Sequence, residues 1–214
     1  MPMVKSALCG LLSVLGCVGL VGAQEYAGAS QPAGAWREPG YNRIAWEPSP
    51  HFAPRSFDIV VDTVVLHHTA NNSLEGVVRW FQNPNSRVSA HFTVGKDGSI
   101  VQHVSTFDRA WHAGPSRDHL GRTSLNNFSI GIEMVNLGDG KDPWTKEQVE
   151  VVGFLIGHLK RRFPIKYIVS HEYIAVPTGR KIDPKNFPWD ALRYLGLELI
   201  YGRPNPPFTA DPRD

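Results

Sequence analysis

The sequence predicts one α/β domain in which a central mixed β-sheet is flanked by helices. Its 214 residues suit a single domain that is large enough to bury a proper core. Short runs rich in β-branched residues alternate with longer segments whose apolar residues recur at helical spacing. Because helices must bury their apolar stripe against another layer, this alternation predicts helices packed on the faces of the sheet.

The strands are predicted from apolar runs bounded by turn residues. Residues 59–66 end in a nearly continuous apolar run, which is typical of a buried central strand. Residues 88–94 and 99–104 flank a Gly-Lys-Asp-Gly turn, so we expect them to form a β-hairpin. Further strands are predicted at 129–135 and 167–170.

Three helices are predicted from their start signals and apolar spacing. Ser73 can cap a helix that begins at Leu74, since its hydroxyl can accept a hydrogen bond from the first turn. Thr145 and Gln148 form a capping-box pattern at the start of a second helix, which Pro164 ends. A last helix is predicted from residue 187 to about residue 199.

The chain is expected to divide into four parts. Residues 1–23 resemble an export signal, with Lys5, an apolar run too short for a comfortable membrane span, and a small-residue cleavage site at Ala23. We expect an extended arm over 24–56, the domain over 57–200 and a tail over 201–214. The mature protein is therefore expected to be periplasmic or secreted.

Both cysteines, Cys9 and Cys17, lie within the predicted signal. The mature chain would therefore have neither disulfides nor cysteine metal ligands. The sequence before Cys17 loosely resembles a lipoprotein box, but the apolar run continues beyond it, which favours simple export. The formal net charge of +2, without a long basic run, argues against nucleic-acid binding. We expect a monomer without a transmembrane span.

Two predicted strands end on histidine. His67 and His68 follow the first apolar run, His171 follows a later one, and Asp183 comes twelve residues after His171. Adjacent strand residues point to opposite faces, so only one of His67 and His68 can join a site directly. Two imidazoles and a carboxylate leave one zinc position open, as in hydrolytic sites. From spacing alone, a zinc site and a structural role are both open.

Glu133, Lys181 and the pair Trp111 and His112 could each have a functional or a purely structural role. Glu133 is a lone acid in an apolar strand, where it could act as a general base or form a salt bridge. Lys181 could stabilise a developing oxyanion or lie solvated in a loop. Trp111 and His112 offer an aromatic surface and a polar group that could contact a substrate. A tryptophan that only packs in a turn is also common.

Together these residues resemble the zinc-dependent N-acetylmuramoyl-L-alanine amidases of the type 2 class. These enzymes share their fold with animal peptidoglycan recognition proteins and short phage amidases. The resemblance runs from about residue 49 to residue 189, and five motifs in one order make it specific. The motifs are VLHHTA (65–70), VSAHF (88–92, followed by Asp97-Gly98), RAWHAG (109–114), NFSIGIE (127–133) and GRKIDP (179–184).

The resemblance implies Zn²⁺ bound by His67, His171 and Asp183. It makes Glu133 the catalytic base and Lys181 the group that polarises the carbonyl. Some relatives have a cysteine as the third ligand, whereas this chain resembles the branch with aspartate. A tyrosine that some relatives carry near the second motif is absent, so more of the proton transfer would fall on Glu133.

The resemblance also implies that Trp111, His112 and His91 line a substrate groove. The substrate would be peptidoglycan or muropeptides, cleaved between N-acetylmuramic acid and L-alanine. One alternative is a non-catalytic peptidoglycan receptor, but such relatives typically lose a zinc ligand. A zinc peptidase is disfavoured because no His-Glu-x-x-His pair is present. A structural zinc site is disfavoured because it usually needs four protein ligands, cysteines among them.

Overall fold

A computed structural model describes residues 44–210 of the chain. Its main element is a seven-stranded sheet in which β4 and β5 pair antiparallel and the other neighbours pair parallel. The mixed sheet predicted from the sequence is therefore confirmed. Its strands, in spatial order, are β1 (Ile44–Trp46), β5 (Ile100–Gln102), β4 (Phe92–Val94), β7 (Ser129–Met134), β3 (Thr63–His68), β8 (Tyr167–Ser170) and β9 (Glu198–Ile200).

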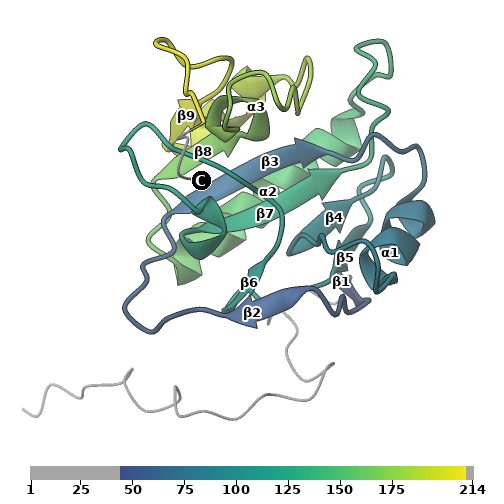
Figure 1. The fold of residues 1–214 in the computed structure, drawn as a ribbon. Helices are drawn as coiled ribbons and strands as arrows, with labels where there is room; N and C mark the ends of the chain where they lie inside the picture. Colours follow the sequence, from purple (N-terminus) through teal and green to yellow (C-terminus); the bar gives the residue numbers. More distant parts are fainter. Residues whose placement is uncertain (1–43, 211–214) are drawn as a thin grey trace, which may run out of the picture. The chain divides into compact units, whose positions relative to one another are not determined.

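The two faces of the central strands differ in what they contact. On one face, alternate residues of β3 and β7 pack against α2 (Lys146–Arg162) and the 3₁₀ helix η2 (Trp189–Leu195), and α2 runs along the sheet in Figure 1. On the other face, Val65 of β3 belongs to a smaller cluster with Ala113 and Ile174. Because side chains alternate along a strand, His67 shares the face of Val65. The central strands thus separate the main core from the face that carries His67.

The predicted starts of the first two helices are confirmed. The Ser73 hydroxyl accepts a hydrogen bond from the Gly76 N–H at 3.1 Å, at the start of α1 (Leu74–Gln82). The Thr145 hydroxyl accepts one from the Gln148 N–H at 3.2 Å, at the start of α2. The remaining short helices are η1 (Leu125–Asn127) and α3 (His171–Ile174).

The predicted last helix is wrong beyond residue 195. The 3₁₀ helix η2 ends there because Gly196 adopts a left-handed conformation, with φ of 62°. Residues 198–200 then form β9, which pairs parallel with β8 at the edge of the sheet. The sheet is therefore one strand wider on this side than the sequence predicts.

Part of the predicted arm belongs to the folded unit. Residues 44–46 form β1 of the main sheet, and β2 (Phe52–Pro54) pairs with β6 (Asp108–Ala110). In the segment between β1 and β2, buried Ser49 donates a hydrogen bond to the Phe81 carbonyl at 2.6 Å, which fixes this segment against the rest of the fold. The predicted signal, both cysteines, the arm as far as residue 43 and residues 211–214 lie outside the described part of the chain.

The first part of the predicted tail packs against the loop that follows α3. The Thr178 N–H donates to the Phe208 carbonyl at 2.9 Å, and the Phe208 N–H donates to the Thr178 hydroxyl at 2.7 Å. The Phe208 ring also contacts Tyr173, with ring centroids 5.8 Å apart.

Within residues 44–210, no helix has the length and apolar character that crossing a membrane requires.

Candidate functional site

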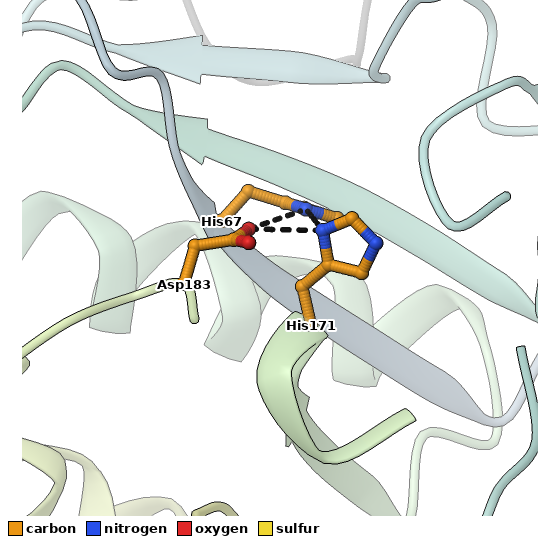
Figure 2. Close-up of side chains that lie close together, drawn as sticks. All are labelled: His67, His171 and Asp183. Atoms are coloured by element: carbon orange, nitrogen blue, oxygen red, sulfur yellow. Dashed lines mark hydrogen bonds and ion pairs between the residues drawn. The ribbon is translucent and has the colours of Figure 1, made fainter. Parts of the chain in front are cut away.

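The three predicted metal ligands meet near the carboxyl ends of the inner strands β3 and β8. His67 lies near the end of β3, and His171 is the first residue after β8, the parallel neighbour of β3. Asp183 comes from the loop after α3, and its carbonyl accepts a hydrogen bond from the Glu172 N–H at 2.8 Å. Figure 2 shows the three side chains pointing toward one another. Their predicted clustering is confirmed.

The ligand atoms are two imidazole nitrogens and one carboxylate oxygen. The Nδ1 atoms of His67 and His171 are 2.9 Å apart. The Asp183 Oδ2 atom lies 3.2 Å from the first of these nitrogens and 2.9 Å from the second. Ligand atoms of a tetrahedral zinc ion are separated by roughly 3.3–3.6 Å. The donor atoms are of the types that zinc takes in sites with a position left for water, and here they lie closer together than the ligand atoms around a bound ion.

Adjacent His68 takes no part in this cluster. It points to the opposite side of β3, as strand alternation requires. Its Nδ1 atom accepts a hydrogen bond from the Lys185 N–H at 3.2 Å. An added Cβ on Gly138 would lie 2.3 Å from the His68 ring, so Gly138 leaves the space that this ring occupies.

Burial and mutual contact set the charges of the cluster. Burial, together with the neighbouring His171, lowers the pKa of His67 to about 4, so this ring is neutral at pH 7. Burial disfavours the Asp183 carboxylate, but its short contacts with His171 and His67 outweigh burial and hold its pKa well below the usual range. A neutral imidazole and an ionised carboxylate are the forms that bind zinc.

Glu133 lies beside the cluster on the same face of the sheet. It is the β7 residue in register with His67 of β3, so the two side chains point to one side. Its Oε2 atom has no hydrogen-bond partner among residues 44–210. Burial, followed by the charge of Asp183, raises the pKa of Glu133 to about 8, although the charge of Lys181 opposes this shift. Such a carboxyl group is suited to exchange protons near neutral pH.

The other predicted site residues lie at different depths. Lys181 is exposed in the loop that leads to Asp183, and its charge acts on His67 and Glu133. Trp111 is partly buried, with its ring centroid 5.5 Å from that of His51. His112 is buried against His67, and their ring centroids are 5.2 Å apart.

His91 does not lie at the surface. Its side chain is fully buried, and its Nδ1 atom accepts a hydrogen bond from the Gly131 N–H at 2.9 Å. Its Nε2 atom lies 3.1 Å from the Asp108 carbonyl. His91 therefore holds neighbouring backbone segments together, and the predicted contact with substrate has no exposed surface through which to form.

Two residues that sequence reasoning missed hold the loops around the cluster. Asn126 accepts hydrogen bonds through its Oδ1 atom from the N–H groups of His112 and Ala113, at 3.1 and 2.8 Å. The Arg180 guanidinium donates to the carbonyls of Ala113 and Pro115, at 3.0 and 2.8 Å. Arg180 lies in the GRKIDP motif, and that was the one available signal. The sequence around Asn126 carries no comparable signal.

Comparison with known proteins assigns the chain to a family of amidases. Residues 57–186 match the family described as N-acetylmuramoyl-L-alanine amidase. The 1,6-anhydro-N-acetylmuramyl-L-alanine amidase AmpD of Citrobacter freundii is 32% identical over 168 residues, which cover 69% of this chain and 87% of that protein.

Solved structures show the same similarity. A selenomethionine derivative of AmpD matches with a TM-score of 0.64 and 30% identity, covering 74% of this chain and 97% of that chain. The Escherichia coli amidase AmiD, in complex with anhydro-N-acetylmuramic acid-L-Ala-D-γ-Glu-L-Lys, matches with a TM-score of 0.57 and 29% identity, covering 67% and 61%. The predicted fold and enzyme class are thus confirmed, and the chain belongs to the N-acetylmuramoyl-L-alanine amidase family.

Proposed function

We propose that this amidase uses zinc held by His67, His171 and Asp183 to hydrolyse the bond between N-acetylmuramic acid and L-alanine of the stem peptide. The observation that carries the proposal is the buried cluster of three ligand atoms beside a carboxyl group with a raised pKa. When bound, zinc supplies a Lewis acid that polarises the amide carbonyl and acidifies water.

Glu133 is proposed as the proton carrier of the reaction. In its ionised form it accepts a proton from the attacking water, and it then returns that proton to the leaving amine of L-alanine. Its position in register with His67 places this carboxyl beside the ligands. Its Oε2 atom, which has no hydrogen-bond partner within residues 44–210, leaves an acceptor for the water.

Lys181 is proposed to stabilise the negative charge that develops on the carbonyl oxygen. Its charge acts electrostatically on both His67 and Glu133, which supports a role in stabilising charge near the ligands. Trp111, which is partly exposed, is proposed to contact the sugar or peptide of the substrate.

The proposed substrates are muropeptides, including those with an anhydro-muramyl end. AmpD of Citrobacter freundii is named for action on 1,6-anhydro-N-acetylmuramyl-L-alanine, and the AmiD structure contains an anhydro-muramyl peptide. Mass analysis of products from intact peptidoglycan and from anhydro-muropeptides, with and without chelator, tests this. We expect free stem peptide that disappears when chelator removes the metal. Binding of muropeptides without any turnover by the zinc-loaded protein would instead indicate a receptor.

We further propose that residues 1–23 direct export and that the protein acts outside the cytoplasm as a monomer. The motivation is the short apolar segment that follows Lys5 and ends at Ala23. Fractionation of cells that express the full chain or a chain without residues 1–23 tests the proposal. We expect the full chain outside the cytoplasm and the truncated, folded chain inside it. An equal distribution of the two chains would contradict export.

A further inference from the structure

We propose that two consecutive residues, His112 and Ala113, fix the proton positions of both histidine ligands and so direct both Nδ1 lone pairs toward the metal. The pair acts through hydrogen bonds to the far nitrogen of each ligand ring. His112 is then a positioning residue rather than a contact for substrate. The inference rests on the proposed zinc function, and the experiment below separates the two.

The assignment for His171 follows from one contact. Its Nε2 atom lies 3.1 Å from the Ala113 carbonyl oxygen. A carbonyl oxygen can only accept a hydrogen bond, so Nε2 must carry the ring proton. In the neutral imidazole Nδ1 then has a free lone pair, and this atom is the one that faces His67 and Asp183.

The assignment for His67 needs a longer chain of contacts. Its Nε2 atom lies 3.0 Å from the His112 Nδ1 atom, and either nitrogen could donate. The hydrogen bonds of Ser129 show which of the two nitrogens is the donor. Its hydroxyl donates its single proton to the Leu125 carbonyl at 2.6 Å, so at 3.2 Å it can only accept from His112 Nε2.

The proton on His112 Nε2 leaves its Nδ1 atom bare. His112 Nδ1 therefore accepts a hydrogen bond, and the donor is Nε2 of His67. The proton of His67 is thereby held on the nitrogen that points away from the cluster. Its Nδ1 lone pair is left for the metal, as in the second-shell arrangement that orients many zinc ligands.

The strand β7 is shaped to accept the His112 ring. Its residues Ser129, Gly131 and Glu133 alternate with the core residues and so share one face. An added Cβ on Gly131 would come within 2.5 Å of the His112 ring, so only glycine leaves the ring this place. One strand thus supplies the hydroxyl that orients His112, the space that His112 fills, and the proposed base.

The backbone of the pair is also held. Asn126 accepts from the N–H groups of both His112 and Ala113, and Arg180 donates to the Ala113 carbonyl at 3.0 Å. His112 is only 9% exposed, and both of its ring nitrogens have protein partners. If a polar atom of His112 contacted substrate, His112 would have to give up its hydrogen bond to Ser129 or to His67.

The experiment compares three variants of the full chain. His112→Leu removes the acceptor for His67, whereas His112→Asn keeps an oxygen close to the position of Nδ1. His103→Leu is the matched control, because His103 is another buried histidine with two hydrogen bonds, to Thr93 and to the Glu47 carbonyl. Two quantities are measured: the His67 tautomer by long-range ¹H–¹⁵N NMR of the metal-free protein at neutral pH, and the zinc Kd by chelator competition.

We expect the wild type and the His103→Leu variant to show His67 protonated on Nε2 only. We expect His112→Leu to mix the two tautomers and to weaken zinc binding by about 10–100-fold, as loss of an outer partner does. His112→Asn should restore most of both. If His112→Leu fails to fold, Ser129→Ala decides, because it removes the hydroxyl that sets the His112 tautomer.

An unchanged His67 tautomer and zinc Kd in His112→Leu would overturn the inference, as would equal losses in His112→Leu and His112→Asn. For Ser129→Ala, an unchanged His67 tautomer would do the same. None of these measurements depends on turnover. If the tautomers and zinc affinities behave as expected while no muropeptide is cleaved, the proposed function fails and the inference stands.

Discussion

The ligand side and the proton-transfer side of the site differ in how completely their polar groups are paired. On the ligand side, each ring nitrogen of His67 and of His171 lies within 3.1 Å of another polar atom, and Asp183 contacts both rings. On the other side, Glu133 leaves one carboxylate oxygen without a partner within the described range 44–210. His67 and Glu133 lie next to each other, on neighbouring strands and on one face of the sheet.

This difference matches two different roles, binding the metal and transferring a proton. Paired, buried groups keep one geometry and one protonation state, which a metal ligand needs. A buried carboxyl group whose pKa is raised to about 8 changes its protonation near neutral pH, which a proton carrier needs. The comparison therefore assigns different consequences to mutations on the two sides of one site.

The largest effect is expected on the ligand side, from Asp183→Ala. The change removes the oxygen that contacts both histidines, so metal binding and hydrolysis should be lost together. Zinc stoichiometry after dialysis and the release of stem peptide measure the two losses. Asp139→Ala, at an exposed carboxylate, is the control. An Asp183→Ala protein that retains zinc at wild-type stoichiometry would contradict this assignment of ligands.

Glu133→Gln tests the opposite side. The change keeps the volume and hydrogen-bonding capacity but removes the base, so hydrolysis should slow by about 10²–10⁴-fold. Zinc stoichiometry should stay that of the wild type, because Glu133 is not among the clustered ligand atoms. Turnover close to the wild-type rate would sink the proposed mechanism but leave the family and fold unaffected.

Lys181→Gln should have a smaller effect on the rate. Loss of a buried oxyanion donor costs about 10²–10³-fold, but Lys181 is exposed and its charge is screened, so we expect roughly 10–10²-fold in kcat. Lys166→Gln, at an exposed lysine just before β8, is the matched control. If both lysine variants kept the wild-type kcat, the oxyanion role of Lys181 would be abandoned.

The sequence predicted those features whose signals are local. The apolar run before His67 fixed a central strand and, by alternation, which of the two histidines faces the cluster. The hydroxyls of Ser73 and Thr145 marked two helix starts that the structure confirms. Each of these signals depends on a few neighbouring residues, so no knowledge of distant contacts was needed.

The missed features depend on contacts between distant segments. The edge strands β1 and β9 are three residues long, too short for a periodic pattern, and they form because a neighbouring strand is available. The contact of His112 with His67 joins residues 45 positions apart, and its direction is set by Ser129. A sequence motif can mark His112 as important, but only the fold shows which atom it contacts.

The last and smallest expected effect concerns stability rather than rate. Burial raises the pKa of Glu133 to about 8, whereas in the unfolded chain it titrates near 4.5. Between these values the folded protein keeps a proton that the unfolded chain has released. The stability that this group contributes is therefore lost as pH rises through this window. Each pKa unit corresponds to roughly 1.4 kcal/mol.

Glu133→Gln removes this titration, so the metal-free variant should gain stability relative to the wild type as pH rises from 5 to 8. His67, with its pKa lowered to about 4, makes folding more favourable as pH rises from 4 to 6.5, but it does so in both proteins and cancels in the difference. Denaturant unfolding of both metal-free proteins across this range measures the difference. Glu150→Gln, at an exposed helix carboxylate, is the control. Parallel stability curves for Glu133→Gln and the wild type would show that Glu133 is already ionised in the folded protein. The contrast between a paired ligand side and an unpaired proton carrier would then fail.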